Sequence, residues 1–150
     1  MSDVFGRPLS ERQARDLRCL AGMMIPASAE HGVPGADDAL IFGDLVRSLG
    51  RDSGVVCAAL DDLAVMSGTA FADLAPARRQ EVATAFHAGG GEGLVVLHRL
   101  VLLCYYRDDR VMRSLDMELR PPFPGGFTVE QGDWSLLDPV RGRPKLWRDA

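Results

Sequence analysis

Histidine is the side chain best suited to acid–base chemistry and metal binding near neutral pH, and the chain has three: His31, His87 and His98. A metal centre or an acid–base site needs two or three such groups to converge with a carboxylate. The spacing contains no HxxxH or HExxH pair, so the sequence predicts no metal site. One alternative stays open, in which His87 and His98 act with nearby carboxylates in a small enzyme.

Other patterns that could support chemistry also favour structural interpretations. The glycine-rich stretch 89–93 precedes an expected helix, as phosphate-binding loops do. It follows a helix rather than a strand and no Lys-Ser/Thr pair comes after it, which favours an interhelical turn. No GxSxG motif is present, and the adjacent pairs Asp61-Asp62 and Asp108-Asp109 point in different directions on a helix. We therefore expect no catalytic, cofactor-binding or metal-ligating residue in this chain.

Composition narrows the classes of partner. The chain has 150 residues, of which 47% are apolar and 25% charged, and a net charge of −4. A nucleic-acid-binding surface is normally basic, so no nucleic-acid partner is expected. The longest apolar run, Leu94 to Tyr106, is shorter than the roughly 20 residues of a membrane span and contains His98-Arg99. It predicts a buried helix and no transmembrane segment.

Helical periodicity and punctuation predict an all-α fold, a compact bundle of five or six helices. Ser10 and Gln13 have the spacing of a capping box, and Pro26 ends that first helix. Gly50 and Gly68 are expected to end the second and third helices, and Pro76 to begin the fourth. The apolar fifth helix runs from Gly93 to about Arg107, and Asp108 caps a last short one through Leu115.

The composition of the sequence changes after residue 117, and its helical periodicity ends there. Residues 118–150 contain five of the nine prolines, both tryptophans and no helical or strand period. A disordered tail is usually poor in aromatic residues. We therefore predict two parts: a helical domain, 1–117, and an irregular C-terminal arm, 118–150, that packs on its own domain or on a partner.

Aromatic residues and arginine are common in binding hot spots, which identifies candidate contacts with a partner. Tyr105-Tyr106 close the apolar helix, where the rings either complete the core or form an interface patch. In the arm, basic residues surround Trp147, which favours contact with an acidic partner groove. The predicted interface residues are Tyr105, Tyr106, Arg110, Phe123, Phe127, Trp134, Leu136, Leu137, Pro139 and Trp147.

Four segments together resemble one family, subunit 3 of the gluconate 2-dehydrogenase type. They are a first helix that ends in residues 24–27 (MIPA), a loop at 32–36 (GVPGA), residues 71–77 (FADLAPA), which are similar to the family's L-S-P-A helix start, and Tyr105-Tyr106 followed by a polar turn and a helix with Val111. The resemblance covers about Leu9 to Leu115 and part of the arm. The Pro34-Gly35 turn, Tyr105 and Tyr106 are the family-like positions.

The resemblance implies an all-α, non-catalytic accessory subunit without a cofactor of its own. The expected partner is a large FAD-dependent oxidoreductase of the glucose-methanol-choline type, which oxidises sugars, sugar acids or polyols. A cytochrome c subunit often takes the electrons. The small subunit would bind and stabilise the large one or assist its maturation or export. A free-standing helical binding module, with its arm packed on its own bundle, stays open as an alternative.

At the N-terminus the sequence differs from the pattern of this family. Many relatives resemble carriers of a twin-arginine export signal, whereas the stretch Met1-Ser2-Asp3-Val4-Phe5 shows neither that signal nor the basic and apolar regions of a signal peptide. The expectation is a cytoplasmic protein, or a periplasmic one if a partner co-exports it.

Overall fold

Six α-helices make up the first part of the chain in a computed structural model that describes residues 7–119, 123–126 and 130–144. These residues contain no strand, so the all-α prediction is confirmed. Two 3-10 turns, η1 (Gly50–Asp52) and η2 (Phe71–Asp73), lie between the helices. The six helices are α1 (Glu11–Met24), α2 (Ala39–Ser48), α3 (Ser53–Ser67), α4 (Pro76–Gly89), α5 (Glu92–Tyr106) and α6 (Asp109–Ser114).

Local signals place most of the helix ends where the sequence predicts them. The backbone N–H of Gln13 donates to Ser10 Oγ (3.2 Å) and the Ser10 N–H donates to Gln13 Oε1 (3.0 Å), which completes the predicted capping box. Gly68 ends α3 with a φ of 70°, a left-handed conformation that suits glycine. Gly50 differs from its prediction: α2 already ends at Ser48, and Gly50 begins η1.

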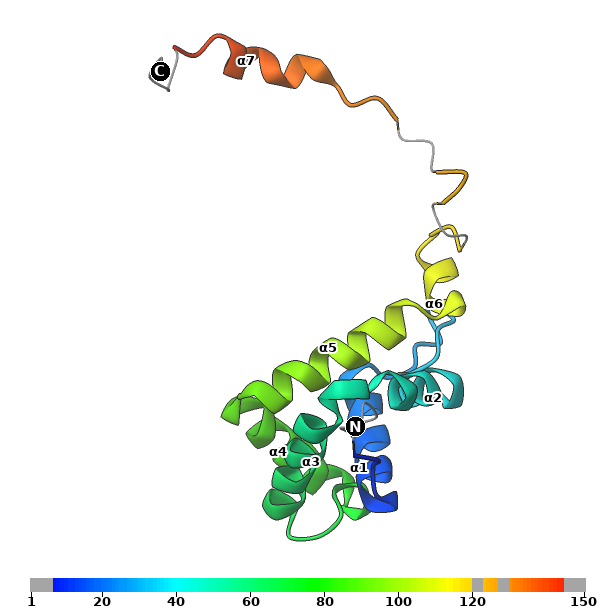
Figure 1. The fold of residues 1–150 in the computed structure, drawn as a ribbon, viewed down its shortest axis with the longest axis vertical. Coiled ribbons are helices and arrows are strands. Elements are labelled where there is room, and N and C mark those ends of the chain that lie inside the picture. The colour runs from blue at the N-terminus through cyan, green and yellow to red at the C-terminus, as the bar shows by residue number, and fades with distance from the viewer. Residues whose placement is uncertain (1–6, 120–122, 127–129, 145–150) are drawn as a thin grey trace, which may run out of the picture. The chain divides into compact units, whose positions relative to one another are not determined.

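The core lies where α3 and α5 pack against their neighbours. Helix α5 packs on α2 and α3, and α3 also contacts α1 and α4 (Figure 1). Leu60 and Leu63 on α3 and Leu97 and Val101 on α5 are at most 1% exposed. At the start of α5 the two backbones approach closely, since a Cβ added to Gly93 would lie 2.6 Å from the Cβ of Ala59.

Helix α1 carries buried polar residues that the apolar periodicity does not predict. The Asp16 carboxylate is fully buried and accepts hydrogen bonds from the Arg12 guanidinium (3.2 Å) and the backbone N–H of Ala72 (2.9 Å). Arg12 also donates to Asp61 on α3, and the Gln13 amide donates to the same carboxylate at 3.0 Å. Because buried polar groups are costly without partners, this network fixes α1 against α3 and η2.

The chain divides into two compact units, Met1–Leu119 and Arg120–Ala150. In the second unit the described residues include a 3-10 turn, η3 (Trp134–Leu137), that continues into α7 (Asp138–Arg141). The sequence predicts an irregular arm, but the arm contains this short helix, which Asp133 caps. The helix is too short to show a helical period in the sequence. The side chain of Asp133 accepts from the backbone N–H of Ser135 at 3.0 Å.

The stretch Gly50–Asp73 has the length and apolar composition of a membrane span, with a mean hydropathy of 1.5 over its best window. Core helices of soluble proteins meet the same criteria. In this structure 33% of that window is buried, and α3, the main part of the stretch, supplies six buried residues.

Candidate functional site

Helix α5 buries one side in the core of the helical unit, and it also carries large apolar side chains that the other helices of that unit leave exposed. Val95, Leu102, Leu103 and Tyr106 are 65%, 45%, 51% and 53% exposed. At 3.6 residues per turn, Val95, Leu102 and Tyr106 follow one line along the helix. Leu103 lies to one side of that line, and the exposed Arg99, which pairs with Asp52, lies between them. We call Val95, Leu102, Leu103 and Tyr106 the outer face of α5. Large apolar side chains gathered on a surface usually mark a binding site.

A cavity of about 480 Å³ lies beside this face, between α1, α4 and α5. Leu102 belongs both to the cavity wall and to the outer face, so the two form one continuous surface. The polar lining of the cavity consists of Gln80, Thr84 and two histidines, and it contains no aspartate, glutamate, lysine or arginine. The apolar wall is formed by Leu20, Met23, Met24, Ile25, Ala83, Phe86, Leu94 and Leu102.

The two histidines in this cavity are His87 and His98, which the sequence separates by eleven residues. Their ring centroids lie 5.5 Å apart, because the chain turns through 112° between α4 and α5. The turn itself is the glycine-rich stretch, in which Gly90 and Gly91 have φ values of 64° and 96°. The histidine pair thus exists, but the cavity lining supplies no carboxylate to orient it for acid–base catalysis.

Tyr105 and Tyr106 have different environments. Tyr105 is 5% exposed and packs in the core, where burial raises the pKa of its hydroxyl. Tyr106 packs edge-on against it, with 5.2 Å between ring centroids, and its own ring is 53% exposed. In this conformation only Tyr106 of the pair is available to a partner.

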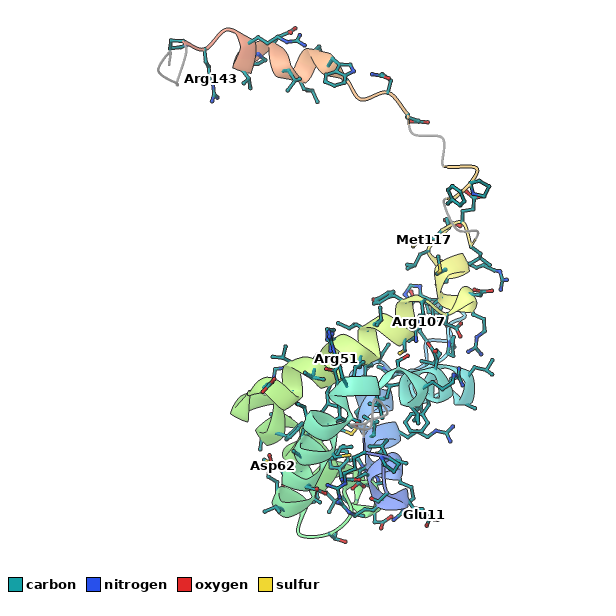
Figure 2. All side chains as sticks on the ribbon, in the orientation of Figure 1. Glu11, Arg51, Asp62, Arg107, Met117 and Arg143 are labelled. Atoms are coloured by element: carbon teal, nitrogen blue, oxygen red, sulfur yellow. The ribbon has the colours of Figure 1, made fainter. Side chains whose placement is uncertain are left out.

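Arg110, another predicted contact residue, has its guanidinium directed into the helical unit. It donates to Asp38 before α2 (2.7 Å) and to Asp108 before α6 (2.9 Å). The hydrogen bonds from Arg110 hold the pKa of both carboxyls below the usual value. Nearby, Arg107, which Figure 2 labels at the end of α5, pairs with Asp44 of α2. These ion pairs attach the ends of α5 and α6 to α2, so the structure gives Arg110 an internal role.

The predicted contact residues of the arm that the structure describes are all exposed. Phe123 is 85% exposed, and Trp134, Leu136 and Leu137 are 57%, 74% and 41% exposed. Pro139 is exposed in the first turn of α7. Val140, which is not among the contact residues predicted from the sequence, is 54% exposed close to them in the chain. Phe127 and Trp147 lie outside the described residues.

No model of a known protein family, no curated protein and no solved structure matches this chain. Within the described part of the chain, no group of three or more His, Cys, Asp or Glu residues is arranged to hold a metal ion. The features that stand out are therefore surfaces: the outer face of α5 with its cavity, and the exposed apolar side chains of the arm.

Proposed function

We propose that this protein is a non-catalytic accessory subunit that binds and stabilises a larger FAD-dependent oxidoreductase. The observation that carries the proposal is the outer face of α5, four large apolar side chains on a helix whose opposite side already serves the core. Such a helix gains further stability when a second surface covers it. A stable complex buries well over about 1,000 Å², which the outer face and the arm could supply together.

The class of the partner rests on the resemblance to subunit 3 of the gluconate 2-dehydrogenase type. Two of the segments that carry it are in contact: the N–H of Ala36, in the GVPGA loop, donates to the carbonyl of Ile25 at 2.9 Å. The large subunit would belong to the glucose-methanol-choline type and oxidise sugars, sugar acids or polyols. It would hold the FAD, and a cytochrome c subunit would accept its electrons.

Co-purification tests this proposal. The tagged full chain is expressed together with the proteins encoded beside it, and the visible spectrum of the eluate is recorded. We expect a large flavoprotein to elute with it. The variant Leu103→Asp should lose at least about nine-tenths of the bound flavin, since a charge would be buried at the interface. Val65→Asp is the matched control, because Val65 is an apolar residue that is 81% exposed on a different helix, α3.

If no flavoprotein elutes with the wild-type chain, the result favours one of two alternatives. The protein is then a free-standing helical module or a small enzyme that uses His87 and His98. The observation in its favour is that these side chains share a cavity of a size that suits a small ligand. A colourless, monomeric eluate from the wild-type co-expression would contradict the accessory-subunit proposal and direct attention to this cavity.

A further inference from the structure

The glycine turn between α4 and α5 brings His87 and His98 together, and both side chains line the cavity between α1, α4 and α5. The backbone carbonyl of His87 accepts from the N–H of Gly90 (3.2 Å) as the turn begins. His98 is half-buried in the second turn of α5, whereas His87 is exposed. Within residues 7–119, 123–126 and 130–144, neither imidazole takes part in a hydrogen bond or an ion pair. Each neutral ring therefore has a nitrogen lone pair available to a ligand.

The distance between the two rings is the distance that a shared metal ion requires. Imidazole binds a metal through one ring nitrogen at about 2.0–2.1 Å, which places the ion roughly 3.2 Å from the ring centroid. Two imidazoles that meet at such an ion at an angle of about 110–120° have centroids roughly 5.2–5.5 Å apart. The centroids of His87 and His98 are 5.5 Å apart. The χ2 torsion of histidine is broad, so each ring can direct a nitrogen at the ion without movement of α4 or α5.

The other groups in the cavity indicate which class of ion fits. Met23 and Met24, at the end of α1, belong to the same lining, and their thioethers are soft, neutral ligands. Imidazole is also neutral when it binds a metal, and the lining residues include no carboxylate or thiol. The cost of an ion whose charge no anionic ligand balances rises steeply with that charge, which favours a monocation over a dication. Among the metals that bind imidazole and thioether, Cu(I) meets this condition.

We propose that His87 and His98 bind one Cu(I) ion in this cavity, with a thioether of the Met23-Met24 pair as the third ligand. Because only two of the histidine, cysteine, aspartate and glutamate side chains meet here, the thioether is needed to complete the site. The sequence does not predict the site, since no metal-binding motif has the spacing of these histidines. The inference is independent of the proposed function, because the site needs no partner protein.

The first test measures the Cu(I) affinity of the full-length chain. Cu(I) is supplied without oxygen in the presence of ascorbate, and the coloured complex of Cu(I) with bicinchoninate reports how much copper the protein withdraws. The wild type should bind one Cu(I) per chain. His87→Gln and His98→Gln should each weaken binding by at least about a hundredfold, since loss of even an outer-shell partner of a metal ligand costs about 10–100-fold. His31→Gln should bind as the wild type does, because His31 is equally exposed but lies outside this cavity.

Thermal unfolding gives a second readout that does not depend on the chelator. An ion that binds only the folded state raises the unfolding midpoint. Cu(I) should therefore raise the midpoint of the wild type and of His31→Gln and leave that of His87→Gln unchanged. Without Cu(I), His87→Gln should unfold at the midpoint of the wild type, because His87 is exposed. Loss of Cu(I) binding by this variant then reports the ligand and not the fold.

The variant Met23→Leu/Met24→Leu tests the thioether, because leucine nearly conserves the volume of the cavity wall. It should weaken Cu(I) binding by at least about tenfold, and the X-ray absorption spectrum of bound copper should lose its sulfur neighbour. Met66→Leu is the matched control, since Met66 is 41% exposed on α3. The spectra are recorded in a Cys19→Ser background, because Cys19 is half-buried whereas the other two cysteines are only 1% exposed.

Each result supports or overturns one part of the proposal. A wild-type chain that binds no Cu(I), or an equal loss of binding in His31→Gln and His87→Gln, would overturn the site. Tighter binding of Zn²⁺ than of Cu(I) by the wild type would overturn the choice of ion. Equal Cu(I) affinity of the wild type and Met23→Leu/Met24→Leu would overturn the thioether ligand. These outcomes stay distinct from those of the co-purification, because no partner protein is present in any of the measurements.

Discussion

The guanidinium of Arg110 is shared by two carboxylates, those of Asp38 and Asp108, and its loss should change how stability depends on pH. The pKa of each carboxyl lies below the ordinary value of 3.8, chiefly because of the hydrogen bond from Arg110. A lowered pKa in the folded state contributes stability that is present above the unfolded value and is lost as the pH falls through the folded one. The contribution therefore exists near neutral pH and disappears in acid.

We expect Arg110→Gln to destabilise the protein at pH 6 and to have a smaller effect at pH 3, because the stability from the lowered pKa values of Asp38 and Asp108 is lost progressively as the pH falls below the ordinary value of 3.8. Urea unfolding at the two pH values measures the difference. Arg113→Gln is the control, since its ion pair with Asp109 is exposed on both sides and should contribute little at either pH. A destabilisation by Arg110→Gln that is equal at pH 6 and pH 3 would contradict the argument.

At this scale the sequence predicts local partnerships and misses distant ones. The capping box of Ser10 and Gln13 is predicted because both members lie within one turn. The partner of Arg110, Asp38, is 72 residues away, so composition alone indicates a surface arginine. Asp16 is missed because one of the two groups that make its burial tolerable, the backbone N–H of Ala72, lies 56 residues away, although the other, Arg12, is one turn away.

The contact between α3 and α5 depends on a residue without a side chain. A Cβ at Gly93 would lie 2.6 Å from that of Ala59, far inside normal contact distance. Although alanine favours helices, we expect Gly93→Ala to lower the free energy of unfolding by about 1–3 kcal/mol, because the two helices must separate. The double variant Gly93→Ala/Ala59→Gly should recover most of the loss. Chemical denaturation measures both.

Gly54, in the first turn of α3, is the matched control. An added Cβ there meets nothing within 4 Å and the backbone is not left-handed, so Gly54→Ala should stabilise the protein by up to about 1 kcal/mol. Equal effects of the two glycine substitutions would show that helix propensity, rather than the contact between α3 and α5, decides the outcome.

Helix ends are predictable from sequence to the extent that each depends on its own neighbours. Pro76 and Asp108 begin helices as expected, because signals of this kind act within a turn. The meeting of His87 and His98 is not predictable, since it depends on the angle through which the glycine turn redirects the chain. The short helix formed by η3 and α7 is missed because the eight residues 134–141 are too few to display a helical period.

For the whole molecule, stability and partner binding should be separable. Every buried residue of the described core, from Leu17 to Val111, lies in the first unit. A chain truncated after Leu119 should therefore unfold cooperatively, with a midpoint within a few degrees of the full chain. Its capture of the flavoprotein should fall at least tenfold. Calorimetry measures the unfolding midpoint of the truncated chain, and co-purification measures its capture of the flavoprotein. A truncated chain that does not fold would show that the arm is part of the core.

The fold class follows from helical spacing, whereas the function does not follow from any pattern of catalytic residues. Surfaces such as the outer face of α5 leave a weak signal in sequence. Its exposed and buried positions are equally apolar, so that only the packing of α2 and α3 distinguishes Leu103 from Leu100. The proposed function of this protein therefore depends on exposure, which the structure supplies.

Two binding elements on one chain have a consequence for kinetics. About 15 residues, 118–132, connect the helices of the first unit to the short helix formed by η3 and α7. Once either element is bound, this covalent connection raises the effective concentration of the other. Each contact alone can then be weak and quickly reversible while the pair dissociates slowly. Avidity of this kind would let the subunit sample a partner that is still maturing and remain bound only after both sites have formed.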